Sequence, residues 1–289
     1  MTIGIIGPGL IGGSIAIDLR RKGFADKFLG VEKEPVNAAA ALQMGIVDEI
    51  VSLEECAARA DIVVVAIPVG AAVKVLPQIL DVFSEKAGGD AGASGQVVID
   101  TCSTKEAVAV SVKGHPMRSR YVATHPMSGT EYCGPWAALP GLFDGRACVF
   151  ADCADSASDA VAIVEKLYDV LNMRPVFMDS KDHDVHTAYV SHLSHVISFA
   201  LAQTVLDKEK DEKHIFDLAS GGFSSTVRLA KSGADMWVPI FIQNKENVLG
   251  VLDTYRDKLD AFRDAIERSD EGKLRDFIAE ANRIKRIIR

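Results

Sequence analysis

Short apolar runs alternate with longer amphipathic stretches along the first half of the chain. The first run, Thr2–Ile6, is apolar and β-branched, which is typical of a strand buried on both faces of a parallel sheet. Strands are expected at residues 2–6, 27–31, 46–50, 61–68, 96–99, 121–124, 146–150 and 175–178. Helices are expected at residues 15–22, 35–44, 53–60, 73–83 and 156–171. This alternation predicts an α/β, Rossmann-like, doubly wound and mostly parallel sheet over residues 1–178.

The pattern changes after Asp179, where no further strand is expected and residues 186–206 have a helical period. Farther on, apolar residues recur at alternating spacings of four and three, as on one face of a long helix. They are Val248, Leu252, Tyr255, Leu259, Phe262 and Ile266, continued by Leu274, Phe277, Ala281, Ile284 and Ile288. So much apolar helix surface predicts an all-α dimerisation domain at residues 179–289, completed by a second copy. A bundle within one chain is the alternative.

Composition narrows the class of protein. The 289 residues carry a formal net charge of −8, so no bulk basic surface for nucleic acid or anionic lipid is indicated. The five cysteines are scattered without a Cys-x-x-Cys pair, which argues against a zinc site or a disulfide framework and fits a reduced, cytoplasmic compartment. The most apolar stretch, residues 62–73, is interrupted by Pro68 and too short to cross a membrane. We expect no metal, nucleic-acid or membrane partner.

A glycine motif links the first strand to the first helix. Residues 7–12 read Gly7, Pro8, Gly9, Leu10, Ile11 and Gly12. In such a motif the first glycine permits a tight turn, the second lets the backbone approach a pyrophosphate, and the third lets the helix pack close to the strand. The helix N-terminus then offers free N–H groups to the phosphates. The motif predicts a dinucleotide site.

NAD is the expected dinucleotide. Glu32 ends the second strand, where an acidic residue bonds the ribose hydroxyls and repels the extra phosphate of NADP. Lys33 weakens this argument because a lysine can meet a phosphate, and Glu32 as a solvated strand end is the alternative. The strand at 61–68 ends in Ile67 and Pro68, followed by small residues 69–71 that suit the wall of a cofactor groove.

Two polar segments follow later strands. Residues 100–105 place Ser103 and Lys105 at a strand's carboxyl end, where a ligand crevice forms; alternatively, Ser103 caps a helix with Glu106 at its third position. Residues 125–131 begin with His125, and their Pro and Gly predict a shaped loop rather than a helix or central strand. We expect His125 to act as a base or hydrogen-bond acceptor beside the dinucleotide; a surface turn is the alternative.

The helical half adds weaker signals. Ser191 and His195 are four residues apart and share a helix face, although such a pair is more often structural. Residues 220–225 break the pattern in a way that suits close ligand approach, and Arg228 follows with a planar fork that matches a carboxylate.

Together these motifs resemble the prephenate/arogenate dehydrogenase family of tyrosine biosynthesis, over nearly the whole chain. The resemblance rests on the glycine motif, on Asp100-x-x-Ser103-x-Lys105, on residues 125–131 (HPMSGTE), on 191–195 (SHLSH), on Gly221-Gly222-Phe223 with Arg228, on Met236-Trp237 and on residues 244–247 (NKEN). It implies a modified Rossmann domain that binds NAD, followed by an all-helical dimerisation domain, and a homodimer.

The resemblance also implies roles for single residues. His125 matches the family's catalytic histidine, and Ser103 the serine that orients it. Substrate-binding positions are matched by Ser191, His195, Arg228, Glu131, Thr130, Gly221 and Trp237. Arg228 would grip a substrate carboxylate. Ser225 departs from the family member compared with this chain, which has aspartate three residues before the arginine, so gating or inhibitor response is not carried over.

The expected function is NAD-dependent oxidative decarboxylation of prephenate to 4-hydroxyphenylpyruvate. An arogenate dehydrogenase, whose substrate has an amine in place of the keto group, is the first alternative. A 3-hydroxyacid dehydrogenase would need a lysine such as Lys231 or Lys245, and neither explains the segment around His125. A non-catalytic NAD(H)-binding module would bind the cofactor without turnover.

Overall fold

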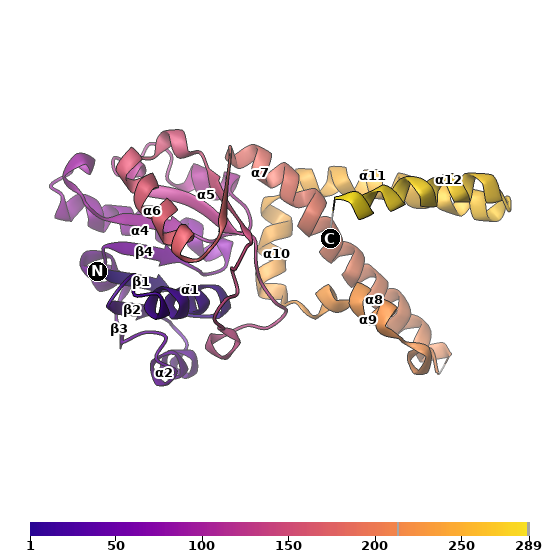
Figure 1. The fold of residues 1–289 in the computed structure, drawn as a ribbon, viewed down its shortest axis with the longest axis horizontal. Coiled ribbons are helices and arrows are strands. Elements are labelled where there is room, and N and C mark those ends of the chain that lie inside the picture. The colour runs from indigo at the N-terminus through magenta and orange to yellow at the C-terminus, as the bar shows by residue number, and fades with distance from the viewer. Residues whose placement is uncertain (213, 288–289) are drawn as a thin grey trace. The chain divides into compact units, whose positions relative to one another are not determined.

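The computed structural model describes residues 1–212 and 214–287. They form two compact units, one from Met1 to Asn244 and one from Lys245 onward (Figure 1). The first unit contains a single eight-stranded sheet, and the second consists of helices.

The sheet follows the strand order β3-β2-β1-β4-β5-β6-β7-β8. Every neighbouring pair is parallel except β6 and β7, so the predicted doubly wound, mostly parallel sheet is confirmed. The strands are β1(Thr2–Ile6), β2(Lys27–Val31), β3(Glu49–Ile50), β4(Ile62–Val65), β5(Val97–Asp100), β6(Tyr121–Pro126), β7(Ala147–Ala151) and β8(Arg174–Met178).

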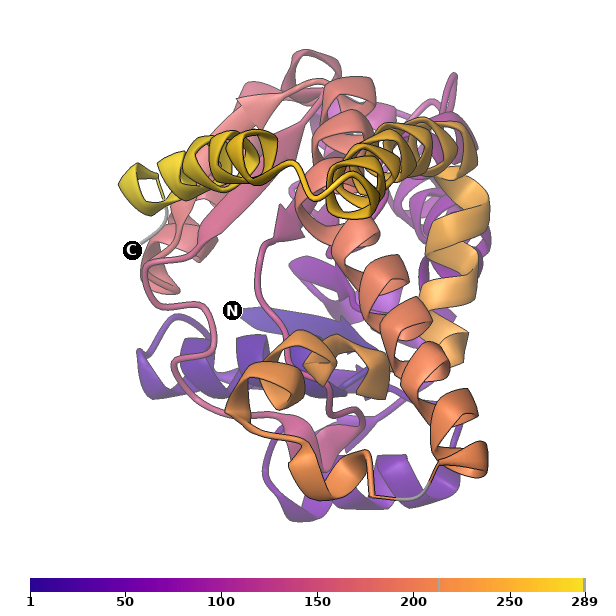
Figure 2. The same cartoon turned by 90° about the vertical axis from the view of Figure 1, so that its right-hand side faces the viewer.

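Six helices connect these strands: α1(Leu10–Arg21), α2(Pro35–Gln43), α3(Leu53–Arg59), α4(Val69–Lys86), α5(Glu106–Ser111) and α6(Ser158–Val170). The rest of the first unit is helical, with α7(Ser180–Thr187), α8(Leu193–Asp211), α9(Gly221–Thr226) and α10(Ala234–Gln243). Figure 2 shows α7 and α8 as one continuous rod, because the π-helical turn η5(Ala188–His192) joins them. This rod begins earlier than the helix expected at residues 186–206.

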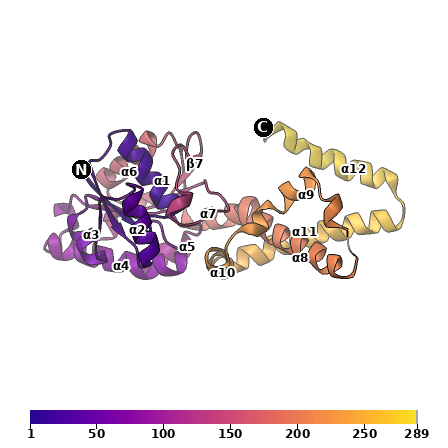
Figure 3. The same ribbon diagram turned by 90° about the horizontal axis from the view of Figure 1, so that it is seen from below.

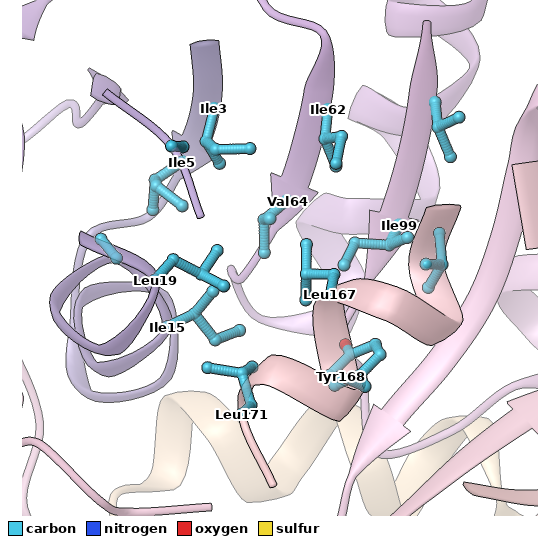
Figure 4. Packing of buried hydrophobic residues seen from close by; sticks show 14 of the residues in the cluster. Ile3, Ile5, Ile15, Leu19, Ile62, Val64, Ile99, Leu167, Tyr168 and Leu171 are labelled. Atoms are coloured by element: carbon cyan, nitrogen blue, oxygen red, sulfur yellow. The ribbon is translucent and has the colours of Figure 1, made fainter. Parts of the chain in front are cut away.

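The helices cover both faces of the sheet (Figure 3). Helices α1 and α6 pack on one face, where Ile15, Leu19 and Leu167 meet side chains such as Ile5 and Val64 (Figure 4). Helices α3, α4 and α5 pack on the other. Helix α10 joins this second layer, since Trp237 and Ile240 belong to its core and Pro239 would lie 3.8 Å from a Cβ at Gly70. The helical segment up to Asn244 therefore shares a core with the sheet.

Three local expectations were wrong. Strand β6 extends through His125 and Pro126, which we expected in a loop. Proline is tolerated there because β6 pairs with β5 only as far as Ala123, so its missing N–H breaks no ladder on that side. Helix α4 starts at Val69, four residues before the helix expected at 73–83, and so includes residues 69–71 in its first turn. The strand expected at 46–50 is reduced to Glu49–Ile50.

The second unit contains α11(Lys245–Glu267) and α12(Glu271–Ala281). The Asp270 carboxylate caps α12 by accepting the Lys273 N–H at 2.9 Å, and Phe262 packs on Phe277 with ring centroids 4.9 Å apart. Part of the predicted apolar face stays exposed: Leu259, Ile266 and Ile284 are each at least 50% accessible. Ile288 lies outside the described residues. Among those residues, no helix is both long and apolar enough to cross a membrane.

Candidate active site

The strand order reverses at β1, which has β2 on one side and β4 on the other. Ligands of open α/β sheets bind in the crevice at such a point. The glycine motif lies there: Gly7 adopts φ +85°, and a Cβ on Gly12 would come within 2.4 Å of the Gly7 carbonyl oxygen. A Cβ on Gly9 would meet nothing closer than 3.9 Å, and no side chain caps the start of α1. The residues present therefore fit a dinucleotide, with backbone N–H groups free for its phosphates.

The other predicted cofactor residues surround this loop. Glu32 follows β2 directly, and its carboxylate accepts the Glu34 N–H at 3.0 Å. Ile67 follows β4 and approaches Gly7, since a Cβ there would meet the Ile67 side chain at 2.7 Å. The remaining members, Pro8, Leu10, Ile11 and Pro68, belong to the loop, the first turn of α1 and the start of α4.

His125 is the first member of a buried, hydrogen-bonded chain of three residues. Its ring is 9% exposed, and Nδ1 lies 2.8 Å from Nε2 of His183 in α7. The other ring nitrogen of His183, Nδ1, lies 2.7 Å from the Asp184 carboxylate. Burial, reinforced by nearby His183 and Lys105, holds the pKa of His125 well below its ordinary value, so the ring is neutral at neutral pH.

Asp184 also holds the start of α5. Its two carboxylate oxygens accept the backbone N–H groups of Lys105 at 2.7 Å and Glu106 at 3.0 Å. The helix is therefore capped by Asp184, and the alternative in which Ser103 caps it is wrong. The Ser103 hydroxyl, which lies just before this helix, has no hydrogen-bond partner among the described residues, so it is available to a ligand.

A buried ion pair lies next to His125. The Lys105 ammonium donates to the Asp100 carboxylate, and both side chains are completely buried. Asp100 also accepts the Tyr121 hydroxyl at 2.6 Å and the Cys102 N–H at 2.9 Å. A buried ion pair of this kind is fixed in place, because removing either charged side chain leaves the other charge without a partner in a low-dielectric interior.

The helical half contributes an aromatic wall. The His195 ring stacks on Trp237 with centroids 3.5 Å apart, and its Nδ1–H donates to the Ser191 carbonyl at 3.0 Å. Burial lowers the pKa of His195, and the positive charge of Arg228 lowers it further. Trp237 is 5% exposed, yet its indole N–H has no acceptor in the described part of the chain. Such a buried donor is a candidate ligand contact.

Arg228 lies at the open end of the site. Its guanidinium is 3.3 Å from the Glu131 carboxylate, and the Arg228 side chain is 52% exposed. Thr130, beside Glu131, accepts the Tyr132 N–H at 3.3 Å. A Cβ on Gly221 would meet no described atom within 4 Å, so the backbone there is open to a ligand. The Ser225 hydroxyl donates to the Gly222 carbonyl at 2.9 Å.

Four residues of this network were not predicted. They are His183, Asp184, His192 and Asn244. The Asn244 amide donates to the Asp184 carbonyl at 2.7 Å and lies 3.1 Å from Nδ1 of His192, whose pKa burial lowers to about 4. The available signal for the first two was a histidine next to an aspartate in the first helix after the last strand. Neither here nor elsewhere in residues 1–212 and 214–287 do three His, Cys, Asp or Glu side chains gather as metal ligands would.

Two family models match this chain. The nucleotide-binding domain of prephenate dehydrogenase matches residues 15–176, and the prephenate dehydrogenase dimerization domain matches residues 179–280. Together they cover the sheet and the helical part. The chain therefore belongs to the prephenate dehydrogenase family.

Individual relatives support this family assignment. Prephenate dehydrogenase of Lactococcus lactis is 28% identical over 283 residues, covering 97% of this chain and 75% of the relative. Cyclohexadienyl dehydrogenase of Zymomonas mobilis is 27% identical over 292 residues, covering 98% and 94%. A crystal structure of prephenate dehydrogenase from A. aeolicus with hydroxyphenyl propionate and NAD+ has a TM-score of 0.85 at 28% identity, covering 99% of this chain and 97% of that one.

Proposed function

We propose that this chain oxidatively decarboxylates prephenate to 4-hydroxyphenylpyruvate with NAD, and that His125 is its base. The observation that carries the proposal is a buried histidine whose Nδ1 is bonded inside the protein while Nε2 has no partner among the described residues. A neutral imidazole held in this way presents one lone pair in a fixed direction.

The base has a defined task. Nε2 of His125 takes the proton of the ring hydroxyl as the carbon that bears it loses its hydride. Carbon dioxide then departs, the ring becomes aromatic, and His125 returns the proton to the phenolate oxygen. No net proton is released, so the histidine only needs to hold one briefly. Ser103, with its free hydroxyl, would orient the substrate hydroxyl toward His125.

The cofactor would lie along the glycine motif. Residues 7–12 and the N-terminus of α1 would hold the pyrophosphate, Glu32 the ribose hydroxyls, and Ile67 and Pro68 the wall of the groove. Bound there, NAD supplies the hydride acceptor. A relative of this chain, the A. aeolicus enzyme, was crystallised with NAD+, which supports this choice.

Prephenate is a dianion, so the acidic chain needs local positive charge. Arg228 is the proposed carboxylate anchor, since its planar fork is half-exposed and is held, among the residues that the structure describes, only by Glu131. Thr130, Ser191, Gly221 and the stacked pair His195 and Trp237 would complete the pocket, with Glu131 beside them holding Arg228 until the substrate carboxylate replaces it.

Arogenate is a second candidate substrate, favoured by one observation. His195 is neutral at pH 7 because its pKa is lowered, and it uses its Nδ1–H on the Ser191 carbonyl. Nε2 of His195 is therefore an acceptor, which suits the ammonium of arogenate better than the keto oxygen of prephenate. The Z. mobilis relative, named for cyclohexadienyl compounds in general, supports testing both substrates.

We further propose a division into a cofactor domain, residues 1–178, and a helical domain, residues 179–289, that forms a homodimer. The two family models meet between residues 176 and 179, and the second is named a dimerization domain. Apolar side chains left exposed on α11 and α12, such as Leu259 and Ile278, are the proposed contact face.

Absorbance of reduced cofactor tests the proposal directly. Purified protein is mixed with NAD and either prephenate or arogenate, and the His125→Asn variant is measured beside it. We expect turnover with prephenate that depends on His125, and the ratio of kcat/KM values decides between the two substrates. Cofactor binding without turnover on either would replace the proposal with a non-catalytic module. Turnover on a 3-hydroxyacid alone would replace it with the other dehydrogenase class.

A further inference from the structure

His183 and Asp184 lie behind His125, on the side away from its free nitrogen. No step proposed above uses them. Both are essentially buried, at 0% and 2% exposure, and they come from α7, whereas His125 comes from β6. A polar chain of this kind inside a protein persists only when each donor meets an acceptor.

The positions of the hydrogens in this hydrogen-bonded chain can be assigned by starting from Asp184. Asp184 accepts two backbone N–H groups, from Lys105 and Glu106, so it is an ionised acceptor. Nδ1 of His183, 2.7 Å from that carboxylate, must then carry a hydrogen, because two bare acceptors would repel at this distance.

One proton per neutral ring determines the rest. Burial lowers the pKa of His183, and although Asp184 opposes this effect, the ring remains neutral. With its proton on Nδ1, His183 offers a bare Nε2 to His125, whose Nδ1 must therefore donate across the 2.8 Å contact. The hydrogen of His125 is thus on Nδ1, and Nε2 holds the lone pair that a base requires.

We propose that His183 and Asp184 are positioning residues that hold His125 in the tautomer with a bare Nε2 and receive positive charge when that nitrogen takes a proton. As the substrate O–H bond breaks, an N–H bond forms at Nε2 of His125, and the Nδ1–H of His125 shifts toward Nε2 of His183. The charge then lies beside the Asp184 carboxylate. This proposal rests on the proposed function only for the identity of the substrate.

The tautomer can be measured without turnover. The 15N chemical shifts of a histidine-labelled sample distinguish a bare ring nitrogen from an N–H, and His125→Asn identifies the resonance. We expect His125 to carry its hydrogen on Nδ1 in the natural protein and on Nε2 in Asp184→Asn, where the amide can donate to His183 and reverse the chain. The surface pair His115 and Asp81, 3.1 Å apart, provides the control Asp81→Asn, which should leave the His125 resonance unchanged.

Kinetics provide a second and independent test. Asp184→Asn should lower kcat by at least about 100-fold with little change in KM, since the same change in a serine-protease triad costs about 10⁴-fold through the wrong tautomer. His183→Gln keeps an acceptor for His125 and should retain turnover within about tenfold, whereas His183→Leu, of similar size, should lose about 100-fold or more.

The variants separate positioning from folding. If Asp184→Asn fails to fold because it loses a helix cap, the comparison of His183→Gln with His183→Leu still tests the proposal. A natural protein with hydrogen on Nε2 of His125, or equal kcat for His183→Gln and His183→Leu, would overturn the proposal. A natural protein inactive on both substrates would refute the proposed function, while the 15N result would still stand for the tautomer.

Discussion

The histidine end of the candidate site lies inside the protein, whereas its arginine end lies at the surface. His125, His183 and Asp184 are at most 9% exposed and form one hydrogen-bonded chain, while the Arg228 side chain is 52% exposed and, within residues 1–212 and 214–287, bonded only to Glu131. The first group is fixed by the sheet and α7 before any ligand arrives. The second can change partner at little cost, because an exposed ion pair is weak.

This difference assigns different work to the two ends. Proton transfer needs groups held within a few tenths of an ångström, so it gains from a rigid, dry setting. Capture of a charged substrate gains from an arginine that can reach into solvent. We therefore expect substitutions at the buried end to lower kcat and substitutions at the exposed end to raise KM.

The largest effect should come from His125→Asn. The amide keeps similar size and one hydrogen bond but cannot take a proton, so kcat should fall by about 10²–10⁴-fold with KM nearly unchanged. Steady-state rates with NAD and the better substrate measure this. His214→Asn, at a histidine whose side chain is 81% exposed, is the control and should be silent. Near-native turnover in His125→Asn would contradict the assignment of the base.

The buried end should also make the protein sensitive to acid. The pKa values of His125, His183, His192 and His195 are lowered in the folded state, so below pH 6.5 the unfolded chain binds more protons. The free energy of unfolding is therefore highest above pH 6.5 and falls as the pH drops toward about 4. His192 alone accounts for roughly 3 kcal/mol of this loss.

Urea unfolding at several pH values between 7.5 and 5 measures this loss, because carboxyl groups of the unfolded chain titrate mostly below that window. His192→Gln should flatten the pH dependence, while His214→Gln should not. An unchanged slope in His192→Gln would show that this ring is not held neutral by burial.

Arg228 tests the exposed end. Arg228→Gln should raise KM by about 10–100-fold with a smaller change in kcat, since a charge-assisted hydrogen bond contributes about 1.5–3 kcal/mol. Arg228→Lys keeps the charge without the planar fork, so its KM should lie between those of the natural protein and Arg228→Gln. If both variants mainly lower kcat, Arg228 would belong with the catalytic groups and the comparison would fail.

The smallest effect should come from Glu131→Gln. Glu131 competes with a substrate carboxylate for Arg228, and exposed ion pairs contribute little, so KM should fall slightly, by no more than about fivefold. A large rise in KM would show instead that Glu131 contacts the substrate itself. Measured together with Arg228→Gln, it also shows whether the two residues act as a pair.

Most of the fold could be predicted because its signals are local. Alternating apolar runs and helical stretches gave the parallel sheet, and Gly7, Gly9 and Gly12 gave the nucleotide loop, since each acts through its own backbone. The errors came where the structure of a segment depends on residues that are distant in the sequence. Pro126 was expected in a loop, yet the missing β5 partner beyond Ala123 allows it to extend β6.

The site divides in the same way. His125 and Arg228 could be proposed from sequence, because each is a residue type suited to its chemistry in a motif of recognisable spacing. His183 could not be connected to His125, because the two are 58 positions apart and meet only when α7 packs beside β6. Ser103 was a candidate cap of α5, but the cap is Asp184, 78 residues from Glu106.

By itself, the sequence determined most of the segments that become strands and helices, and the backbone positions that need glycine, because these depend on neighbours along the chain. The tertiary structure alone decided which nitrogen of His125 is free. That choice depends on a hydrogen-bond chain through His183 to Asp184, and such a chain exists only after the sheet and α7 have excluded water from around it.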